Sequence, residues 1–177
     1  MKNILWVFLL VVIVSCKKDT VTPSATNFIL QSSDFANNGA LPKDYTCDGL
    51  SASPPLNWIN PPTGTVSFAV VMYHVPPSPE ANHVYMLVYN IPSTVASLAT
   101  NTTGVGLFGI NTVNGKTEYK PPCSQGLGSK TYIMTVYALS AAPVFSVAQT
   151  QVTRDLLLAA ISNTTFGTST LTVTYMR

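Results

Sequence analysis

Two apolar runs separated by a proline-rich turn dominate the hydrophobic pattern of the chain. Val66–Tyr73 and Val84–Asn90 are rich in β-branched residues, and each has the length of a strand that is buried on most of its surface. The turn between them contains Pro76, Pro77 and Pro79, which cannot donate a backbone N–H to a sheet ladder. The pattern therefore predicts a central pair of buried strands joined by this turn.

Shorter segments on either side of this pair predict the rest of the architecture. Thr131–Leu139 alternates as a core strand does, and Phe28–Ser32 and Leu171–Tyr175 predict strands near the two ends of the chain. Thr153 can cap a short helix over Arg154–Ser162. The apolar face of this helix would consist of Leu156, Leu157, Ala160 and Ile161. Short strands separated by proline and glycine turns, with one clear helix, predict an all-β sandwich.

The composition fits one globular domain and excludes several functions. The chain has 177 residues, of which 46% are hydrophobic and 9% charged, and its formal net charge is +2. A chain with this many apolar residues can bury a sizeable core and is not disordered. It also lacks the stripe of basic residues that a nucleic-acid-binding protein needs. A partner would therefore be recognised by a local site and not by a long-range electrostatic field.

The N-terminus has the pattern of an export signal. Lys2 precedes a continuous apolar run, Ile4–Val14, which has the length of a signal-peptide core and is too short to span a bilayer. The run ends in an Ile-Val-Ser-Cys sequence at Cys16, which resembles the lipobox of bacterial lipoproteins. We therefore expect a signal peptide over residues 1–15, a lipid on Cys16 and a polar tether over residues 16–27. An ordinary secretory signal is the alternative.

The lipobox resemblance also bears on location and on the remaining cysteines. Lys17 follows the cysteine in place of Asp, as in lipoproteins sent to the outer membrane, so we expect a lipid-anchored protein of the bacterial cell envelope. Residues 28–177 would form its exported domain. Cys47 and Cys123 remain, and an even pair in an oxidising compartment predicts a disulfide, with two free buried thiols as the alternative.

Candidate chemistry centres on the turn between the two apolar runs. Both histidines of the chain, His74 and His83, stand at the ends of this turn, where an exposed loop is the alternative to a functional site. Two histidines with so few carboxylates nearby cannot supply the ligands of a metal centre, so we predict no metal site. Gly104–Gly109 matches the GxGxxG spacing, but the residues after it do not favour a helix, which excludes a dinucleotide fingerprint. The chain has no Gly-x-Ser-x-Gly elbow, which argues against a hydrolase.

Five motifs follow one another in register along the exported domain. They are Tyr45-Thr46-Cys47-Asp48-Gly49, Ser53-Pro54-Pro55-Leu56-Asn57-Trp58, Tyr89-Asn90-Ile91-Pro92, Tyr119 with Pro121-Pro122-Cys123, and Tyr132 leading into Thr135–Leu139. Together they resemble the bacterial branch of the phosphatidylethanolamine-binding protein (PEBP) family. The resemblance implies a Greek-key β-sandwich with one or two short peripheral helices and a small pocket at one end that binds phosphate or a phospholipid head group. It also implies that the loops carrying the two cysteines meet near the mouth of that pocket.

The residues at the implied pocket depart from the family's pattern. The family's Asp-Pro-Asp-Ala-Pro run corresponds here to Met72–Pro76, so both acidic positions are lost. The histidine that opens the family's next strand corresponds to His83 or Tyr85, which share a strand face, and its second histidine corresponds to Lys130. We therefore predict that His83, Tyr85, Tyr119 and Lys130, with His74 at the rim, bind the ligand, since both histidines flank one turn and Lys130 stands where the family has its second histidine. Packing in the core is the alternative role for the tyrosines.

These expectations combine into one predicted function. The chain would be a lipid-anchored, non-enzymatic binding protein for a small anionic or phosphate-bearing ligand such as a phospholipid head group. Its partners would be that ligand and, through Cys16, the membrane, with no cofactor and no nucleic acid. The alternative is an inhibitor or interaction module that acts on an envelope protease or kinase, as some relatives do.

Overall fold

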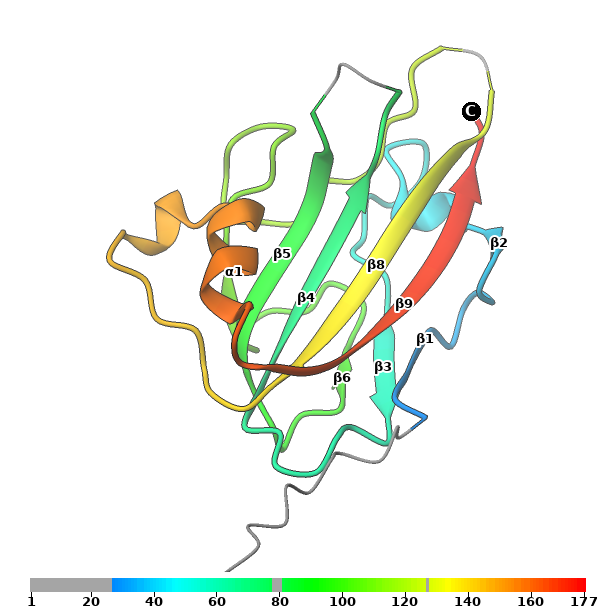
Figure 1. The fold of residues 1–177 in the computed structure, drawn as a ribbon. Coiled ribbons are helices and arrows are strands. Elements are labelled where there is room, and N and C mark those ends of the chain that lie inside the picture. The colour runs from blue at the N-terminus through cyan, green and yellow to red at the C-terminus, as the bar shows by residue number, and fades with distance from the viewer. Residues whose placement is uncertain (1–26, 78–80, 127) are drawn as a thin grey trace, which may run out of the picture.

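The two predicted apolar runs form the middle of a six-stranded sheet in the computed structural model, which describes residues 27–77, 81–126 and 128–177. β4 (Ser67–His74) pairs antiparallel with β5 (His83–Pro92) on one side and with β8 (Lys130–Leu139) on the other (Figure 1). Every residue of β4 except Tyr73 is buried. A strand that is apolar on both faces must lie between two packed layers, which places β4 at the centre of the domain.

The remaining strands complete the larger sheet and form a smaller one. They are β1 (Ile29–Gln31), β2 (Gly39–Ala40), β3 (Leu56–Ile59), β6 (Ser97–Leu98), β7 (Leu107–Phe108) and β9 (Thr165–Tyr175). The larger sheet has the order β2-β9-β8-β4-β5-β7, and the smaller sheet has the order β1-β3-β6. All pairs are antiparallel except β2 with β9, where the N-terminal part of the domain joins the sheet edge in parallel.

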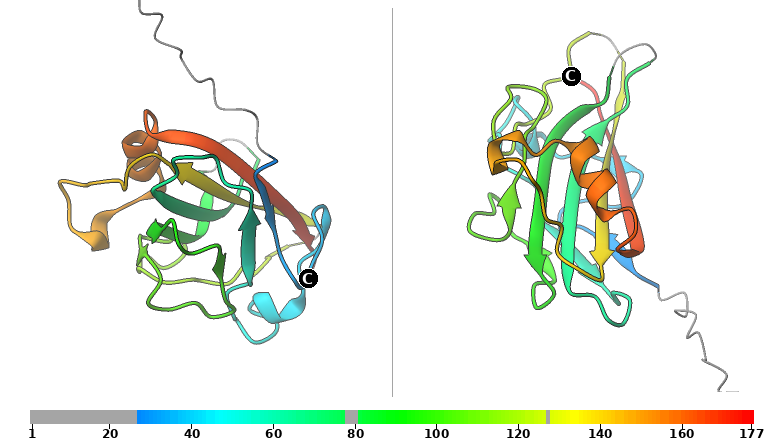
Figure 2. Two further views of the ribbon diagram at one scale, coloured as in Figure 1. Left: turned by 90° about the horizontal axis from the view of Figure 1, so that it is seen from below. Right: turned by 60° about the vertical axis from the view of Figure 1, so that its left-hand side comes forward.

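The main core lies between the two sheets. Side chains from β4, β5, β8 and β9 meet those of β1, β3 and β6 in one buried cluster. At its centre the ring of Trp58 lies 5.1 Å from that of Phe68, and Phe28 stacks on the same phenyl ring at 6.3 Å. Figure 2 shows the two layers from further directions. The predicted all-β sandwich is confirmed.

The opposite face of the larger sheet is covered by α1 (Arg154–Ile161). Thr153 caps this helix by accepting a hydrogen bond from the backbone N–H of Leu156 at 3.3 Å. Leu157 and Ile161 pack on Ala69 and Val71 of β4. Two short 3-10 turns, η1 (Lys43–Tyr45) and η2 (Gln149–Gln151), are the other helical elements of the described residues, none of which is long and apolar enough to cross a membrane.

The predicted apolar face of the helix was too wide. Leu157 and Ile161 are buried, whereas Leu156 is 42% exposed and Ala160 is also exposed. The helix has eight residues and lies on the edge of the domain, so only the residues one turn apart on its inner side reach the sheet.

The last strand is longer than predicted. β9 begins at Thr165 and not at Leu171, because its first half alternates half-buried and exposed residues without the apolar positions on which the prediction relied. Threonine is nevertheless a favourable strand residue, and this half pairs with β8 through Leu139. Between β5 and β8, the two-residue strands β6 and β7 form. The segment after Gly109 is not helical, as predicted.

Cys47 and Cys123 form a disulfide, which confirms the predicted pairing. Their Cα atoms are 5.2 Å apart and their sequence separation is 76 residues. The backbone N–H of Cys47 also donates to the carbonyl of Pro122 at 3.0 Å. The bridge therefore joins the loop after η1 to the loop that leads into β8.

Removal of the disulfide should cause a large loss of stability. Replacing both cysteines, Cys47→Ser with Cys123→Ser, should lower the free energy of unfolding by up to about 4.5 kcal/mol, because the unfolded chain regains the entropy of a long open loop. Urea unfolding of the full chain measures this change, and Cys16→Ser is the matched control that leaves the loop closed. Two free thiols in the native, alkylated wild-type protein by mass spectrometry would contradict the pairing.

The two adjacent leucines of α1 provide a matched test of the helix face. Leu157→Ala should destabilise the domain by about 2–5 kcal/mol, since it leaves a cavity against β4. Leu156→Ala should change stability by less than about 0.5 kcal/mol, since this side chain is largely in solvent. Thermal or urea unfolding compares the two variants, and equal losses would show that the helix is rotated from the orientation described.

Candidate functional site

A cavity of about 420 Å³ opens at the end of the larger sheet where β5 and β8 begin. Its lining comes from the start of both strands, from the loop after β7 and from the loop after the disulfide. The lining residues are His83, Tyr85, Thr112, Val113, Cys123, Ser124, Gln125 and Lys130. Three of the predicted ligand-binding residues, His83, Tyr85 and Lys130, are therefore brought together.

His83 and Tyr85 reach this cavity from one strand. They are two positions apart in β5, so both side chains project from the same face, as predicted. His83 is exposed, whereas Tyr85 is buried with its ring 5.5 Å from that of Tyr132 in a T-shaped arrangement. Burial raises the pKa of Tyr85, so its hydroxyl stays protonated at neutral pH and can donate a hydrogen bond.

Lys130 connects this cavity to a second one. It is the first residue of β8, opposite Tyr175 of β9. The second cavity, of about 500 Å³, is lined by His74, Val75, Pro76, Pro77, Ser129, Lys130 and Thr131. Neither Asp nor Glu is among the described lining residues of either cavity, so the Lys130 ammonium supplies the only formal side-chain charge there. An anion in either space would meet a cation that no lining carboxylate neutralises.

His74 lies beside the first cavity and lines the second. It is the last residue of β4 and pairs directly with His83 of β5, with ring centroids 6.2 Å apart. Its Nδ1 lies 2.7 Å from the carbonyl oxygen of Thr131, and the side chain is 8% exposed. The predicted place of His74 at the rim agrees with this geometry.

Tyr119 is not brought into the same cavity. Its hydroxyl donates to the carbonyl oxygen of Tyr45 at 2.6 Å, and its ring packs against the main core. Burial raises the pKa of Tyr119, which keeps the hydroxyl protonated for this bond. Its side chain lines a separate cavity of about 350 Å³, with Ser53, Asn101 and other polar residues. The packing role, which is the alternative for the tyrosines, fits Tyr119.

Two buried hydroxyls near the first cavity neighbour each other but have no well-aligned hydrogen-bond partner among the described residues. They belong to Ser124, which lines the cavity, and to Tyr132, whose ring contacts both Tyr85 and His74. Burial, followed by the neighbouring Tyr85 phenol, raises the pKa of Tyr132, so it too stays neutral. Buried hydroxyls are costly when unpaired, and they favour a polar group in the adjacent space.

Asn111 holds the loop that supplies Thr112 and Val113. This side chain is completely buried, and its Oδ1 accepts from the backbone N–H groups of Val113 and Asn114, each at 3.0 Å. Its Nδ2 donates to the carbonyl oxygen of Lys116 at 2.9 Å. Thr112 is fastened to β5 in turn, since its Oγ1 accepts from the N–H of Val84 at 2.8 Å. Hydrogen bonds within the loop and to β5 therefore hold it in place beside the cavity.

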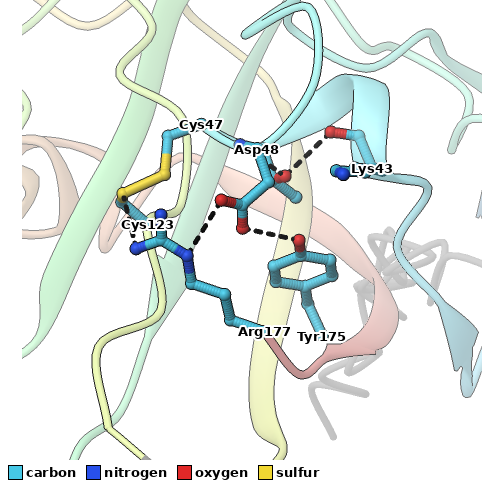
Figure 3. Close-up of polar contacts among 7 residues, drawn as sticks. Lys43, Cys47, Asp48, Cys123, Tyr175 and Arg177 are labelled. Carbon is cyan, nitrogen blue, oxygen red and sulfur yellow. Dashed lines mark hydrogen bonds and ion pairs between the residues drawn. A yellow bond between two sulfur atoms is a disulfide. The ribbon is translucent and has the colours of Figure 1, made fainter.

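The disulfide joins the lining residue Cys123 to the loop after η1, which contains a carboxylate that is already paired (Figure 3). Asp48 accepts a hydrogen bond from the hydroxyl of Tyr175 at 2.7 Å and lies 2.9 Å from Nε of Arg177. The carboxylate side chain is 14% exposed. Its negative charge is therefore paired with the guanidinium of Arg177.

Sequence reasoning missed the residues that loops bring to the cavity, namely Thr112, Val113, Ser124 and Gln125. The available signal was the turn chemistry of Asn111–Gly115, which marked a structured loop without showing which strand it contacts. Among the described residues no group of three or more His, Cys, Asp or Glu side chains is placed to hold a metal ion.

Comparison with known proteins agrees with this architecture. The family model "Phosphatidylethanolamine-binding protein" matches residues 31–176. The chain is 32% identical over 136 residues to a UPF0098 protein of Chlamydia pneumoniae, covering 75% of this chain and 87% of that protein. It is 31% identical over 150 residues to a UPF0098 protein of Chlamydia trachomatis, covering 82% of this chain and 97% of that protein.

Solved structures show the same fold. A putative PEBP homologue from Chlamydia trachomatis has a TM-score of 0.77 and 29% sequence identity, over 85% of this chain and 97% of that chain. Escherichia coli YbcL, described as a member of the mammalian PEBP family, has a TM-score of 0.75 at 23% identity, over 85% of this chain and 98% of that chain. At that identity the likeness to YbcL shows the fold alone. With a family model that spans most of the domain and relatives above 30% identity, the chain belongs to the phosphatidylethanolamine-binding protein family.

Proposed function

We propose that the chain is a non-enzymatic binding protein for a small phosphate-bearing ligand, either free phosphate or a phospholipid head group. The observation that carries this proposal is the place of Lys130, which lines two adjoining cavities that have no lining carboxylate in the described residues. An ammonium without a paired carboxylate retains its charge for a ligand. Membership of the PEBP family supports a binding role of this type.

The size and chemistry of the two cavities fit such a ligand. The first cavity can hold a phosphate group between Lys130, the imidazole of His83 and the hydroxyl of Tyr85. Hydroxyl, imidazole and ammonium donors are the groups that recognise phosphate oxygens. The second cavity, which Lys130 shares, has an apolar side formed by Val75, Pro76 and Pro77. This side suits the less polar remainder of a head group.

The proposal places this binding domain on a membrane surface. The lipobox at Cys16, which lies outside the described residues, would supply the anchor, and two acyl chains are enough for stable attachment. The polar tether over residues 16–27 would leave the cavities free to meet lipid or soluble ligands in the bacterial cell envelope. An interaction module that acts on an envelope protease or kinase is the second proposal, and a phosphate-binding experiment separates the two.

Lys130→Met should weaken phosphate binding by about 1.5–3 kcal/mol, because it removes one charge-assisted hydrogen bond. This loss corresponds to roughly a tenfold to 150-fold higher Kd. Calorimetric or NMR titration of the full chain in detergent with phosphate, phosphoethanolamine and a short-chain phosphatidylethanolamine measures the loss and separates free phosphate from a lipid head group. Lys116→Met is the matched control, since this exposed lysine lines neither cavity.

Two results would contradict the proposed binding site. If the wild type and Lys130→Met bind phosphate with equal affinity, Lys130 does not contact the ligand. Chemical-shift changes far from His83 and Tyr85 would place the ligand elsewhere. A wild-type protein that binds none of the three probes would favour the interaction module.

If Cys16 carries the lipid anchor, its replacement should change where the protein is found. Cys16→Ser should give a protein without acyl chains that is released from membranes, because the thiol that would carry the diacylglycerol is gone. Metabolic labelling with palmitate, followed by membrane fractionation, measures both effects. Label that persists in Cys16→Ser would rule out lipidation at this residue and favour the ordinary secretory signal.

A further inference from the structure

The two histidines of the chain are directly opposite each other across two strands. His74 ends β4, His83 begins β5, and the register pairs them residue to residue. The ring centroids are 6.2 Å apart, with an angle of 58° between the ring planes. Side chains that are paired in this way lie on the same face of the sheet and can act on one ligand.

One of the two rings is already oriented by a neighbouring strand. Nδ1 of His74 lies 2.7 Å from the carbonyl oxygen of Thr131, which can only accept, so Nδ1 carries the proton. In the neutral imidazole the other nitrogen, Nε2, then has a free lone pair. A histidine that donates through one nitrogen to a backbone carbonyl and offers the other is the usual arrangement of a metal ligand.

The spacing of the rings is close to that needed for a shared metal ion. With metal–nitrogen bonds of about 2.1 Å and a tetrahedral angle at the ion, two imidazoles place their ring centroids roughly 5 Å apart. The observed 6.2 Å is longer than this, and rotation of the exposed His83 side chain would bring its ring closer to that of His74. We propose that His74 and His83 form a two-histidine site for a divalent transition metal such as Zn²⁺, Ni²⁺ or Cu²⁺.

The proposed site is open, and it departs from the sequence-based expectation of no metal site. Two protein ligands are too few for a closed structural site, but they leave coordination positions for water or an anion. Imidazole ligands select Zn²⁺, Ni²⁺ and Cu²⁺ over Mg²⁺ and Ca²⁺, which prefer oxygen ligands. The ammonium of Lys130, which lines the cavities of both histidines, opposes a bound cation. Its removal should therefore strengthen metal binding.

Calorimetric titration of the full chain in detergent, purified without a polyhistidine tag, tests the site with Zn²⁺. The wild type should bind one equivalent of Zn²⁺. His83→Gln should bind Zn²⁺ about a hundredfold more weakly, because the second imidazole of the wild type binds an ion that the first already holds nearby. His74→Asn is the second variant, since the Asn amide can keep the hydrogen bond to the Thr131 carbonyl while it lacks a nitrogen in the place of Nε2. The double variant should lose less affinity than the sum of the two single losses. With Cu²⁺, electron paramagnetic resonance should show two imidazole nitrogens in the wild type and at most one in each single variant.

Lys130→Met separates this inference from the proposed function. It should strengthen Zn²⁺ binding several-fold and weaken phosphate binding, so the two sites can fail independently. Zn²⁺ affinity that is the same in the wild type and His83→Gln would overturn the metal site. Losses in the two single variants that add in the double variant would also overturn it, since they would indicate separate, one-ligand contacts. A wild type that fails to bind Zn²⁺, with phosphate affinity that falls in Lys130→Met, would overturn the metal site and leave the proposed function standing.

Discussion

The burial of β4 on both faces is the constraint on which the rest of the structure depends. Phe68, Val70 and Met72 point into the core between the sheets, whereas Ala69 and Val71 point to the opposite face, beneath α1. Neither set can reach water without a large cost in hydrophobic free energy, so each face needs its own covering layer. The smaller sheet supplies one layer, and α1 with the loop before it supplies the other. The pocket end begins where this apolar run gives way to His74 and the prolines.

The candidate site depends on connections between distant parts of the chain. The disulfide ties Cys123 of its lining to Cys47 of the loop after η1, and the Tyr175 hydroxyl binds Asp48 across 127 residues. Asn111 organises another wall through bonds to its own loop. The polar side chains around the cavity are thus held by covalent and hydrogen-bonded supports, which reduces the ordering cost that a small ligand would otherwise pay on binding.

Features that depend on local pattern could be predicted from the sequence more completely than features that depend on long-range contact. β4, β5 and β8 are apolar along their length, so their existence and nearly all of their bounds could be predicted. The first half of β9 could not, because Thr165–Thr170 carries no apolar alternation and forms a strand only through its partner β8. The family motif predicts a place for Tyr119 in the pocket, but its hydroxyl is bound to the carbonyl of Tyr45, which no local pattern indicates. Thr112 and Ser124 were missed for the same reason.

The edge of β9 has a consequence for how the protein reaches its native state. The segment from Leu30 to Leu41 covers this edge: Leu30 N–H donates to Ser169 Oγ across 139 residues, and Asn38 N–H donates to the Thr172 carbonyl at 2.7 Å. The first and last parts of the domain are therefore partners, so this edge is completed only after the final strand has been synthesised. Until then β8 is an open edge that can pair with another chain, and such long-range pairing is slow. Release of an incomplete chain would thus favour aggregation, and a chaperone that shields the strand edge would have its greatest effect in that interval.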